Sequence, residues 1–198
     1  MAVAQQYISP QEYLKAERVS ELRHEYYAGQ VYDMSGGSHA HSLIASNVIR
    51  EVGNRLMDRP CEVHGSDFRI KIEATGLYTY ADAVILCGGP HFEDSERDTL
   101  LNPVVVFEVL SDSTEKYDRG LKFEHYRKIP TLSQYVLVAQ DRAHADTFLK
   151  NGSGEWILAE ADGVESILPL HSMRIDLPMS ALYYRVSFDS DGDILHEN

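Results

Sequence analysis

Hydrophobic and polar positions follow two different periods along this chain, and its first part has the pattern of a helix, a hairpin and a second helix. Ser9-Pro-Gln-Glu12 combines a capping serine, a proline suited to the first helical position and a glutamate that can close a capping box. We therefore predict a helix that continues to about Arg18. Two β-prone runs between His24 and Met34 flank Ala28-Gly29, which indicates a β-hairpin.

A long helix is predicted next, because apolar residues recur at helical spacing as far as about Asp58. The apolar stripe consists of Leu43, Ile44, Val48, Val52 and Leu56. Ser38 or His39 leads into this helix, and Pro60 ends it.

Short apolar runs rich in β-branched residues predict a series of strands after this helix. In chain order they are Cys61 to Glu73 with a bend or break around Gly65, Leu77 to Cys87, Val104 to Leu110, Tyr135 to Ala139, Ala145 to Lys150, Trp156 to Glu160 and Ser166 to Leu168. The stretch from His91 to Thr99 is expected to be an acidic surface loop. Two more helices are expected, one capped within Ser111-Asp-Ser-Thr114 and running to about Lys128, and a short one near Ser180 to Tyr184.

This order of elements predicts an α/β (α+β) fold in which a mixed central β-sheet is flanked by helices. The 198 residues suffice for one domain with a single core, and neither a linker nor a repeat divides the chain. We expect one domain over residues 1–198, with its core at about 9–184 and an acidic C-terminal tail at 187–198.

Two acidic residues occupy positions where a buried strand normally has apolar side chains. Asp82 lies within Tyr80-Ala-Asp-Ala-Val-Ile-Leu-Cys87, and Glu108 lies within Val104-Val-Val-Phe-Glu-Val-Leu110. A buried carboxylate is costly unless a cation, a metal or several hydrogen-bond donors pair with it. If the two strands are neighbours, the carboxylates can share one Mg²⁺, a hard ion that prefers oxygen ligands. The alternative is a structural role, in which each acid accepts hydrogen bonds from backbone N–H groups or from an arginine.

Three further residues are candidates for the same site. Lys122 follows the Glu108 strand on the next helix, where its ammonium group could orient a water or stabilise charge on a phosphate. Taken alone, its i,i+4 spacing from Asp118 favours an ordinary solvated ion pair. Glu25, in the hairpin, could add a carboxylate, although a glutamate at a strand edge is more often solvated. His41, just inside the long helix, could cap it, contact a phosphate or simply pack.

The net charge of −13 disfavours tight nonspecific binding to nucleic acid, which normally requires a basic surface. A nucleic-acid substrate is still compatible with this charge, because basic residues cluster locally and a bound metal would offset the carboxylates around it. The local cluster consists of Lys116, Arg119, Lys122, Arg127 and Lys128.

The remaining features of the sequence are typical of a cytoplasmic protein. The first residues lack the basic region and apolar stretch of an export signal, and no segment approaches the roughly 20 apolar residues that span a bilayer. Cys61 and Cys87 have no metal-ligand spacing, so we expect both to be reduced, buried thiols.

The sequence lacks the motifs of P-loop NTPases, Rossmann cofactor domains, α/β-hydrolases and H-E-x-x-H metalloproteases.

Several longer motifs are specific when they are taken together. They are Arg23-His-Glu-Tyr-Tyr-Ala-Gly29, Gly76-Leu-Tyr-Thr-Tyr-Ala-Asp82, Asn102-Pro-Val-Val-Val-Phe-Glu-Val-Leu-Ser111 and Tyr117-Asp-Arg-Gly-Leu-Lys-Phe123. With them, the chain from Ser9 to about Tyr184 resembles the Uma2 family of restriction endonucleases, a branch of the PD-(D/E)XK nuclease superfamily. The resemblance implies a restriction-endonuclease-like core and metal-dependent hydrolysis of phosphodiester bonds.

The resemblance also implies a role for each candidate residue. Asp82 and Glu108 match the two acids of the motif, Lys122 matches a lysine that this branch carries on the next helix, Glu25 matches an acid of the N-terminal hairpin, and His41 matches a histidine at a helix start. The usual lysine two places after the second acid is absent, since Leu110 stands there. Ala81 replaces the usual proline before the first acid, a residue that shapes the backbone and binds no metal.

The sequence therefore predicts a cytoplasmic, Mg²⁺- or Mn²⁺-dependent endonuclease that hydrolyses DNA. Asp82 and Glu108 would bind the metal, Lys122 and Glu25 would be further catalytic groups, and His41 would support the site. DNA binding is expected to be weak or site-specific, no membrane is involved, and a homodimer would allow both strands to be cut. The alternatives are a catalytically silent nuclease fold that serves as a binding or regulatory module, and a hydrolase of small phosphodiesters.

Overall fold

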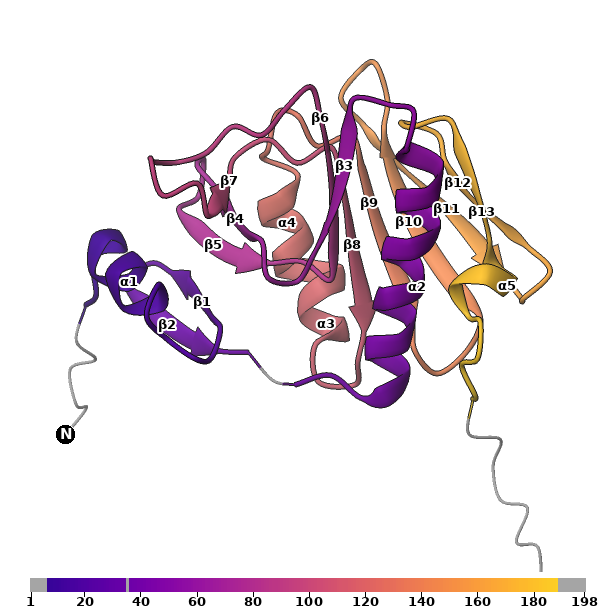
Figure 1. The fold of residues 1–198 in the computed structure, drawn as a ribbon, viewed down its shortest axis with the longest axis horizontal. Coiled ribbons are helices and arrows are strands. Elements are labelled where there is room, and N and C mark those ends of the chain that lie inside the picture. The colour runs from indigo at the N-terminus through magenta and orange to yellow at the C-terminus, as the bar shows by residue number, and fades with distance from the viewer. Residues whose placement is uncertain (1–6, 35, 189–198) are drawn as a thin grey trace, which may run out of the picture.

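The N-terminal part of the protein forms the predicted helix and hairpin. The computed structural model describes residues 7–34 and 36–188, so most of the predicted acidic tail lies outside the described residues. The first elements are α1 (Pro10–Glu17), β1 (His24–Tyr27) and β2 (Gln30–Asp33) (Figure 1). The capping box is confirmed: the Ser9 hydroxyl accepts a hydrogen bond from the Glu12 N–H at 3.3 Å, and the Glu12 carboxylate accepts one from the Ser9 N–H at 2.8 Å.

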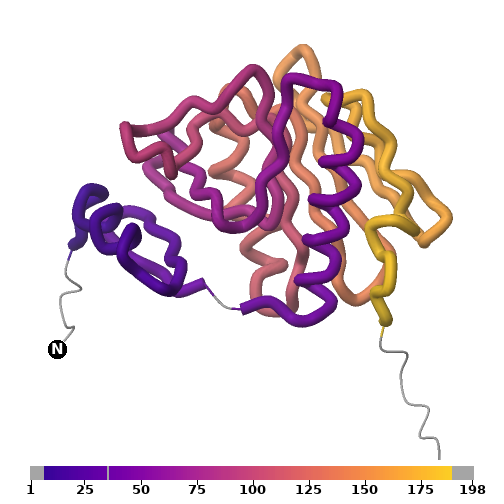
Figure 2. The backbone as a smooth tube through the Cα atoms, in the orientation of Figure 1, coloured from indigo at the N-terminus to yellow at the C-terminus, as the bar shows by residue number. Residues whose placement is uncertain are grey.

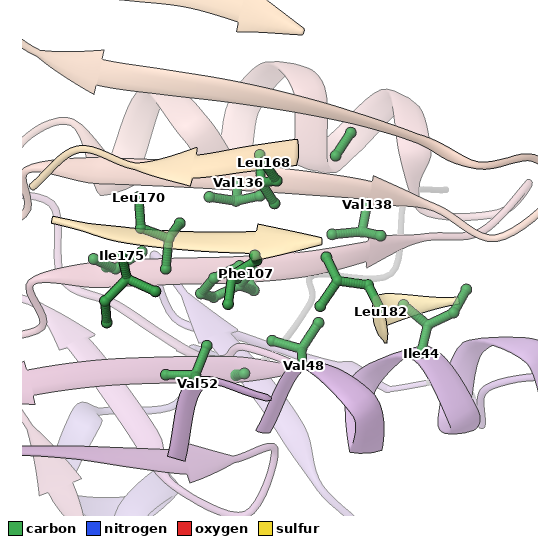
Figure 3. Close-up of a cluster of buried hydrophobic side chains, with 14 of the residues drawn as sticks. Ile44, Val48, Val52, Phe107, Val136, Val138, Leu168, Leu170, Ile175 and Leu182 are labelled. Atoms are coloured by element: carbon green, nitrogen blue, oxygen red, sulfur yellow. The ribbon is translucent and has the colours of Figure 1, made fainter. Parts of the chain in front are cut away.

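The long helix α2 (His39–Leu56) begins where the sequence predicts. Its cap is Ser38, whose hydroxyl accepts a hydrogen bond from the His41 N–H at 3.0 Å. Of the predicted stripe, Ile44, Val48, Val52 and Leu56 are buried, whereas Leu43 is only partly buried. Figure 3 shows Val48 and Val52 of this stripe in the same core as Phe107, a residue of the central sheet.

A six-stranded mixed sheet forms the centre of the molecule, with the strand order β11-β10-β9-β8-β6-β3. Its strands are β3 (Cys61–Gly65), β6 (Ala83–Cys87), β8 (Val105–Leu110), β9 (Gln134–Ala139), β10 (His144–Lys150) and β11 (Trp156–Asp162). Strands β8 and β9 run parallel, and the other neighbours run antiparallel. The predicted fold class, a mixed central sheet flanked by helices, is confirmed.

Each face of this sheet is covered by a different set of elements. One face packs against α2, the hairpin of β12 (Ile167–Leu170) and β13 (Ile175–Pro178), and α5 (Met179–Leu182). Figure 2 shows this C-terminal segment, in yellow, beside α2. The other face packs against the helix that follows β8 and against a second, five-stranded sheet of order β2-β1-β5-β4-β7. Besides β1 and β2, the five-stranded sheet contains β4 (Arg69–Ile72), β5 (Leu77–Tyr80) and β7 (Thr99–Leu100).

One predicted strand, Leu77 to Cys87, is wrong, because the chain changes sheets within it. Strand β5 pairs with β4 in the five-stranded sheet, whereas β6 pairs with β3 and β8 in the central sheet. The break falls at Ala81-Asp82. It lies next to the break of the preceding segment, which was predicted around Gly65, because Gly65 is paired with Ala83. Both halves of the run are apolar because both sheets bury it, so hydrophobicity alone does not reveal the corner.

The helix after β8 differs from the prediction at its start and in its middle. It consists of α3 (Glu115–Tyr117), a π-helical turn η1 (Asp118–Lys122) and α4 (Phe123–Tyr126). No side chain caps it. Instead, the Glu115 N–H donates to the backbone carbonyl of Ser111 at 2.8 Å. The short strands β7 and β13 were not predicted, since runs of two and four residues give too little pattern to detect.

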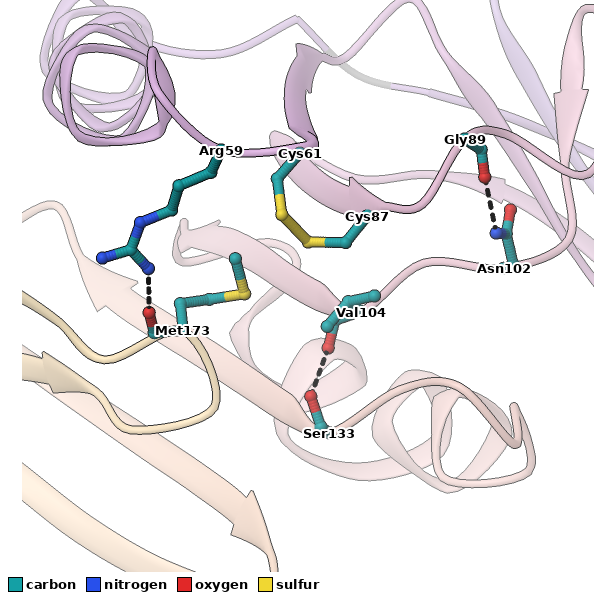
Figure 4. The surroundings of a disulfide bond; sticks show 8 residues. All are labelled: Arg59, Cys61, Cys87, Gly89, Asn102, Val104, Ser133 and Met173. Atoms are coloured by element: carbon teal, nitrogen blue, oxygen red, sulfur yellow. Dashed lines mark hydrogen bonds between the residues drawn. A yellow bond between two sulfur atoms is a disulfide. The ribbon is translucent and has the colours of Figure 1, made fainter.

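The prediction of two reduced thiols is wrong, because Cys61 and Cys87 form a disulfide (Figure 4). The antiparallel register of β3 and β6 places the two residues directly opposite each other. Disulfides are rare in proteins of the reducing cytosol, so the cysteines do not support a cytosolic location. Among the described helices, none is long and apolar enough to cross a membrane.

Candidate active site

Asp82 lies at the corner where the chain passes from one sheet to the other. Because Ala83 is opposite Phe107, Asp82 stands at the level of Glu108 on the neighbouring strand β8. The Asp82 side chain acts as the hydrogen-bond partner of a backbone N–H of β8, since its Oδ2 accepts a hydrogen bond from the Val109 N–H at 2.7 Å. Asp82 is therefore held by the end of the β6–β8 ladder, and its position depends on the corner.

His41 of α2 holds the other oxygen of Asp82. Its Nε2 lies 2.8 Å from Oδ1 of Asp82, and this hydrogen bond raises the pKa of His41. Gly37 makes room for the ring, because a Cβ at that position would lie 2.7 Å from Cδ2 of His41. This contact fixes the side chain of Asp82, and a supporting role for His41 in the site stays a prediction.

Glu108 is buried in the middle of β8 and points toward the helix after it. Its Oε1 lies 2.9 Å from Nζ of Lys122 and accepts a hydrogen bond from the Tyr126 hydroxyl at 3.1 Å. Burial raises the pKa of Glu108 well above the ordinary carboxyl value, although the nearby ammonium group opposes this shift. Among the described residues, Oε2 of Glu108 has no hydrogen-bond partner, so one oxygen remains available to a ligand.

The ammonium group of Lys122 lies among three of the carboxylates of this site. Its Nζ lies 2.9 Å from Glu108, 3.5 Å from Asp118 and 3.6 Å from Glu25, and it donates to the Tyr80 carbonyl at 3.2 Å. Burial alone would lower the pKa of Lys122, but the surrounding carboxylates together raise it well above the usual ammonium value. Lys122 is 5% exposed and Asp118 3%, so the solvated ion pair favoured by their spacing is wrong.

Glu25 reaches the same site from the N-terminal hairpin. Its two oxygens accept hydrogen bonds from the Thr79 hydroxyl and, at 3.1 Å, from the Tyr117 hydroxyl. A solvated strand-edge role is therefore wrong for Glu25. The hairpin joins the site because β1 pairs with β5 at Tyr26 and Tyr78.

Asp118 was not predicted as a site residue, yet it lies in the same cluster. The π-helical turn carries Asp118 at its first position and Lys122 at its last, and both side chains are buried. Burial raises the pKa of Asp118 above the ordinary carboxyl value. The spacing from Lys122 was the available signal for this acid, and it is equally common on exposed helix surfaces. Short π-helical segments occur frequently at functional sites, which agrees with this placement.

All the predicted residues meet at one cavity of about 200 Å³. Its lining includes Glu25, His41, Asp82, Glu108, Asp118 and Lys122. With Asp33, five carboxyl groups line this cavity against one ammonium and one imidazole, so the cavity has an excess of acidic groups. Carboxylate oxygens around a small cavity are the donor set that a hard divalent cation prefers. The residues present therefore fit a Mg²⁺ or Mn²⁺ ion.

A tighter group of metal-ligating side chains lies outside this cavity. In the part of the chain that the structure describes, His144, Asp146 and Glu160 have ligand atoms within 4.8 Å of one another. The predicted pair of Asp82 and Glu108 is not part of that group. In the cavity, three carboxylates gather around the ammonium group of Lys122 instead.

Two residues of the predicted local basic cluster, Arg119 and Lys122, form ion pairs with acidic residues, which lowers the positive charge of this surface. Arg119 forms ion pairs with Glu115, at 2.7 Å, and with Asp146. Lys122 is enclosed by carboxylates, so neither residue contributes an uncompensated positive charge to the surface. Lys116, Arg127 and Lys128 remain exposed along this helix and its end.

Comparisons with known proteins agree with these observations. The model of the Uma2 family, described as "Putative restriction endonuclease", matches residues 10–180. Two proteins of Synechocystis sp. (strain PCC 6803), each described as uncharacterised, are similar in sequence. One is 35% identical over 181 residues, covering 91% of this chain and 94% of its own length, and the other is 30% identical over 164 residues, covering 83% and 93%. Among solved structures, "a putative nuclease belonging to DUF820" from Anabaena variabilis ATCC 29413 has a TM-score of 0.72 at 16% identity, covering 87% of this chain and 96% of that one.

Proposed function

Because this chain belongs to the Uma2 family, we propose that it is a metal-dependent endonuclease that hydrolyses DNA phosphodiester bonds. The family resemblance predicted from the sequence is confirmed by the family model, and the fold is shared with the Anabaena protein. The observation that carries the proposal is the buried Lys122, held by three carboxylates beside Asp82 in one cavity. Several buried ionisable groups that face a cavity are typical of catalytic sites.

Asp82 and Glu108 would hold the metal. Oδ1 of Asp82 accepts one hydrogen bond and keeps a second lone pair, and Oε2 of Glu108 has no partner among the described residues. A divalent cation would also relieve the repulsion among the buried carboxylates, which favours its binding. When bound, such an ion activates water and polarises the phosphate.

The other residues would act on the water and the phosphate. Lys122 would orient the attacking water and stabilise the negative charge that develops on the phosphate oxygens. Glu25 would extend the shell of polar groups around the metal and its water. His41 would keep Asp82 in place through their 2.8 Å contact.

The net charge of −13 and the paired basic residues imply weak or site-specific binding to DNA. We further propose that the protein acts as a homodimer, in which two cavities would act on the two strands of a duplex.

The first test is calorimetric titration of Mg²⁺ and Mn²⁺ into wild type and Asp82→Asn, with plasmid cleavage assayed on the same samples. Asparagine keeps an acceptor for the Val109 N–H, whereas alanine would leave that buried donor unpaired at a cost of about 1–3 kcal/mol. We expect Asp82→Asn to lose metal binding and cleavage together. Asp58→Asn, at the exposed end of α2, is the matched control and should retain both.

Other outcomes of this titration would favour one of the two alternative functions. Wild type that binds the metal but cleaves only short phosphodiesters would identify a small-molecule hydrolase. Wild type that binds no Mg²⁺ or Mn²⁺ and cleaves nothing would contradict the proposal and favour a binding or regulatory module.

Affinity for Mg²⁺ is expected to rise with pH. Burial raises the pKa of Glu108 and of Asp118, so both carboxyl groups keep protons at pH values where exposed acids are ionised. A protonated Glu108 is a poor ligand, and a protonated Asp118 adds no negative charge to the cavity, so affinity should increase as pH rises through these raised pKa values, and binding should release protons. Titrations at about pH 5 and about pH 8, each in two buffers of different ionisation enthalpy, measure both effects. An affinity that is independent of pH, with no proton release, would contradict this assignment.

A further inference from the structure

A second group of metal-ligating side chains lies on the outer strands of the central sheet. His144 and Asp146 of β10 and Glu160 of β11 have ligand atoms within 4.8 Å of one another. Asp146 is directly opposite Glu160, and His144 is directly opposite Asp162. Because side chains alternate between the two faces of a strand, all four project from the same face. The register of one antiparallel pair therefore gathers an imidazole and three carboxylates.

The orientation of His144 suits a metal ligand. Its Nδ1 lies 3.0 Å from Oδ1 of Asp162, and its Nε2 lies 3.3 Å from Oδ1 of Asp146. A carboxylate that accepts a hydrogen bond from one ring nitrogen fixes the tautomer and directs the other nitrogen to a metal. Nε2 of His144 is thereby directed toward the side chain of Asp146, which belongs to the same ligand group.

Among the described residues, Arg119 is the only arginine or lysine that forms an ion pair with the carboxylates of this cluster. Arg119 pairs with Oδ2 of Asp146, and it also pairs with Glu115, so one guanidinium serves two acids. Glu160 and Asp162 add two further carboxylates on the same face, and like charges directly opposite each other in a sheet are destabilising. Asp146 is 4% exposed, which makes its repulsion with Glu160 harder for water to screen. A cation bound between them would remove this cost.

We propose that His144, Asp146 and Glu160 bind Zn²⁺ or a similar transition-metal ion, with Asp162 orienting His144. A set of one imidazole and two carboxylates suits such ions, whereas Mg²⁺ prefers oxygen ligands alone. Three protein ligands leave a fourth position for water. The ion would tie the edge strand β11 to β10.

This site is separate from the cavity around Lys122. Asp146 and Glu108 both stand opposite Leu137 of β9, one on each side. Two strand spacings, about 10 Å, therefore separate their backbones across the same sheet face. The inference goes beyond the proposed nuclease function and does not rest on it.

The test is Zn²⁺ titration of the full chain by calorimetry, together with thermal unfolding with and without Zn²⁺. We expect wild type to bind Zn²⁺ and to unfold at a higher temperature in its presence. Glu160→Gln and His144→Ala should each reduce the stoichiometry by one and abolish the shift due to this site. Asp162→Asn should weaken binding by about 10–100-fold, as the loss of an orienting group does.

Three controls keep the result interpretable. Glu165→Gln removes an exposed acid just beyond β11 and should bind as wild type does. Asp82→Asn should keep this Zn²⁺ equivalent, which separates the site from the nuclease cavity. Glu160 is exposed, so Glu160→Gln tests the proposal even if His144→Ala fails to fold. The proposal is wrong if Glu160→Gln binds Zn²⁺ like wild type, or if Asp82→Asn removes this equivalent.

Discussion

Lys122→Met is expected to slow DNA cleavage by at least about a hundredfold and to destabilise the metal-free protein by about 3–5 kcal/mol. Methionine keeps most of the volume of the side chain but removes its charge. Glu108, Asp118 and Glu25 would then share a buried space without their common cation. Removal of one partner from a buried ion pair is strongly destabilising, because the remaining charge is left uncompensated.

Urea unfolding and plasmid cleavage measure the two effects of Lys122→Met. Lys116→Met is the matched control, since Lys116 is exposed on the same helix, and its stability should lie within about 0.5 kcal/mol of wild type. Mg²⁺ should restore part of the lost stability by binding to the folded carboxylates. A variant that is destabilised but cleaves at the wild-type rate would restrict Lys122 to a structural role. Unchanged stability would contradict the buried ion-pair cluster itself.

Glu108→Gln is expected to lose Mg²⁺ binding and at least about a hundredfold in cleavage, while its stability stays unchanged or rises. Glutamine has nearly the same shape and can still accept hydrogen bonds from Tyr126 and Lys122. Burial already raises the pKa of Glu108, so the protein disfavours its charged form and a neutral replacement costs little. Asp118 and Glu25 remain as partners of Lys122.

The contrast between Glu108→Gln and Lys122→Met separates catalysis from folding. Both variants should lose activity, but only the lysine variant should lose stability. Glu124→Gln, an exposed acid two residues after Lys122, serves as the control for metal binding and cleavage. If Glu108→Gln were grossly destabilised without metal, Glu108 would be a structural acid. If it bound Mg²⁺ like wild type, Glu108 would not be a metal ligand.

Local elements of this protein were predictable because neighbouring residues decide them. The capping box of Ser9 and Glu12, the turn at Ala28-Gly29 and the apolar stripe of α2 depend on contacts within a few positions. The same holds for Glu108, since an acid within a continuous apolar run is evident without any structure.

Pairing between strands that are distant in the sequence decided the features that could not be predicted from local patterns. The corner at Ala81-Asp82 exists because β5 and β6 pair with strands of different sheets. The disulfide exists because β3 and β6 align Cys61 with Cys87. An apolar run or a pair of distant cysteines looks the same whichever strands it meets, so no local pattern could reveal either result.

The sequence indicated which residues belong to the candidate site, and the tertiary structure decided how their charges are arranged. Residue type and hydrophobic context marked Asp82 and Glu108 as acids that could share a site if their strands were neighbours, and the family resemblance gave roles to Lys122, Glu25 and His41. The tertiary structure decided how the charges are distributed: it buried Asp118, and it placed the Lys122 ammonium among three carboxylates. Burial and charge compensation depend on every element packed around a group, and those elements come from distant parts of the chain.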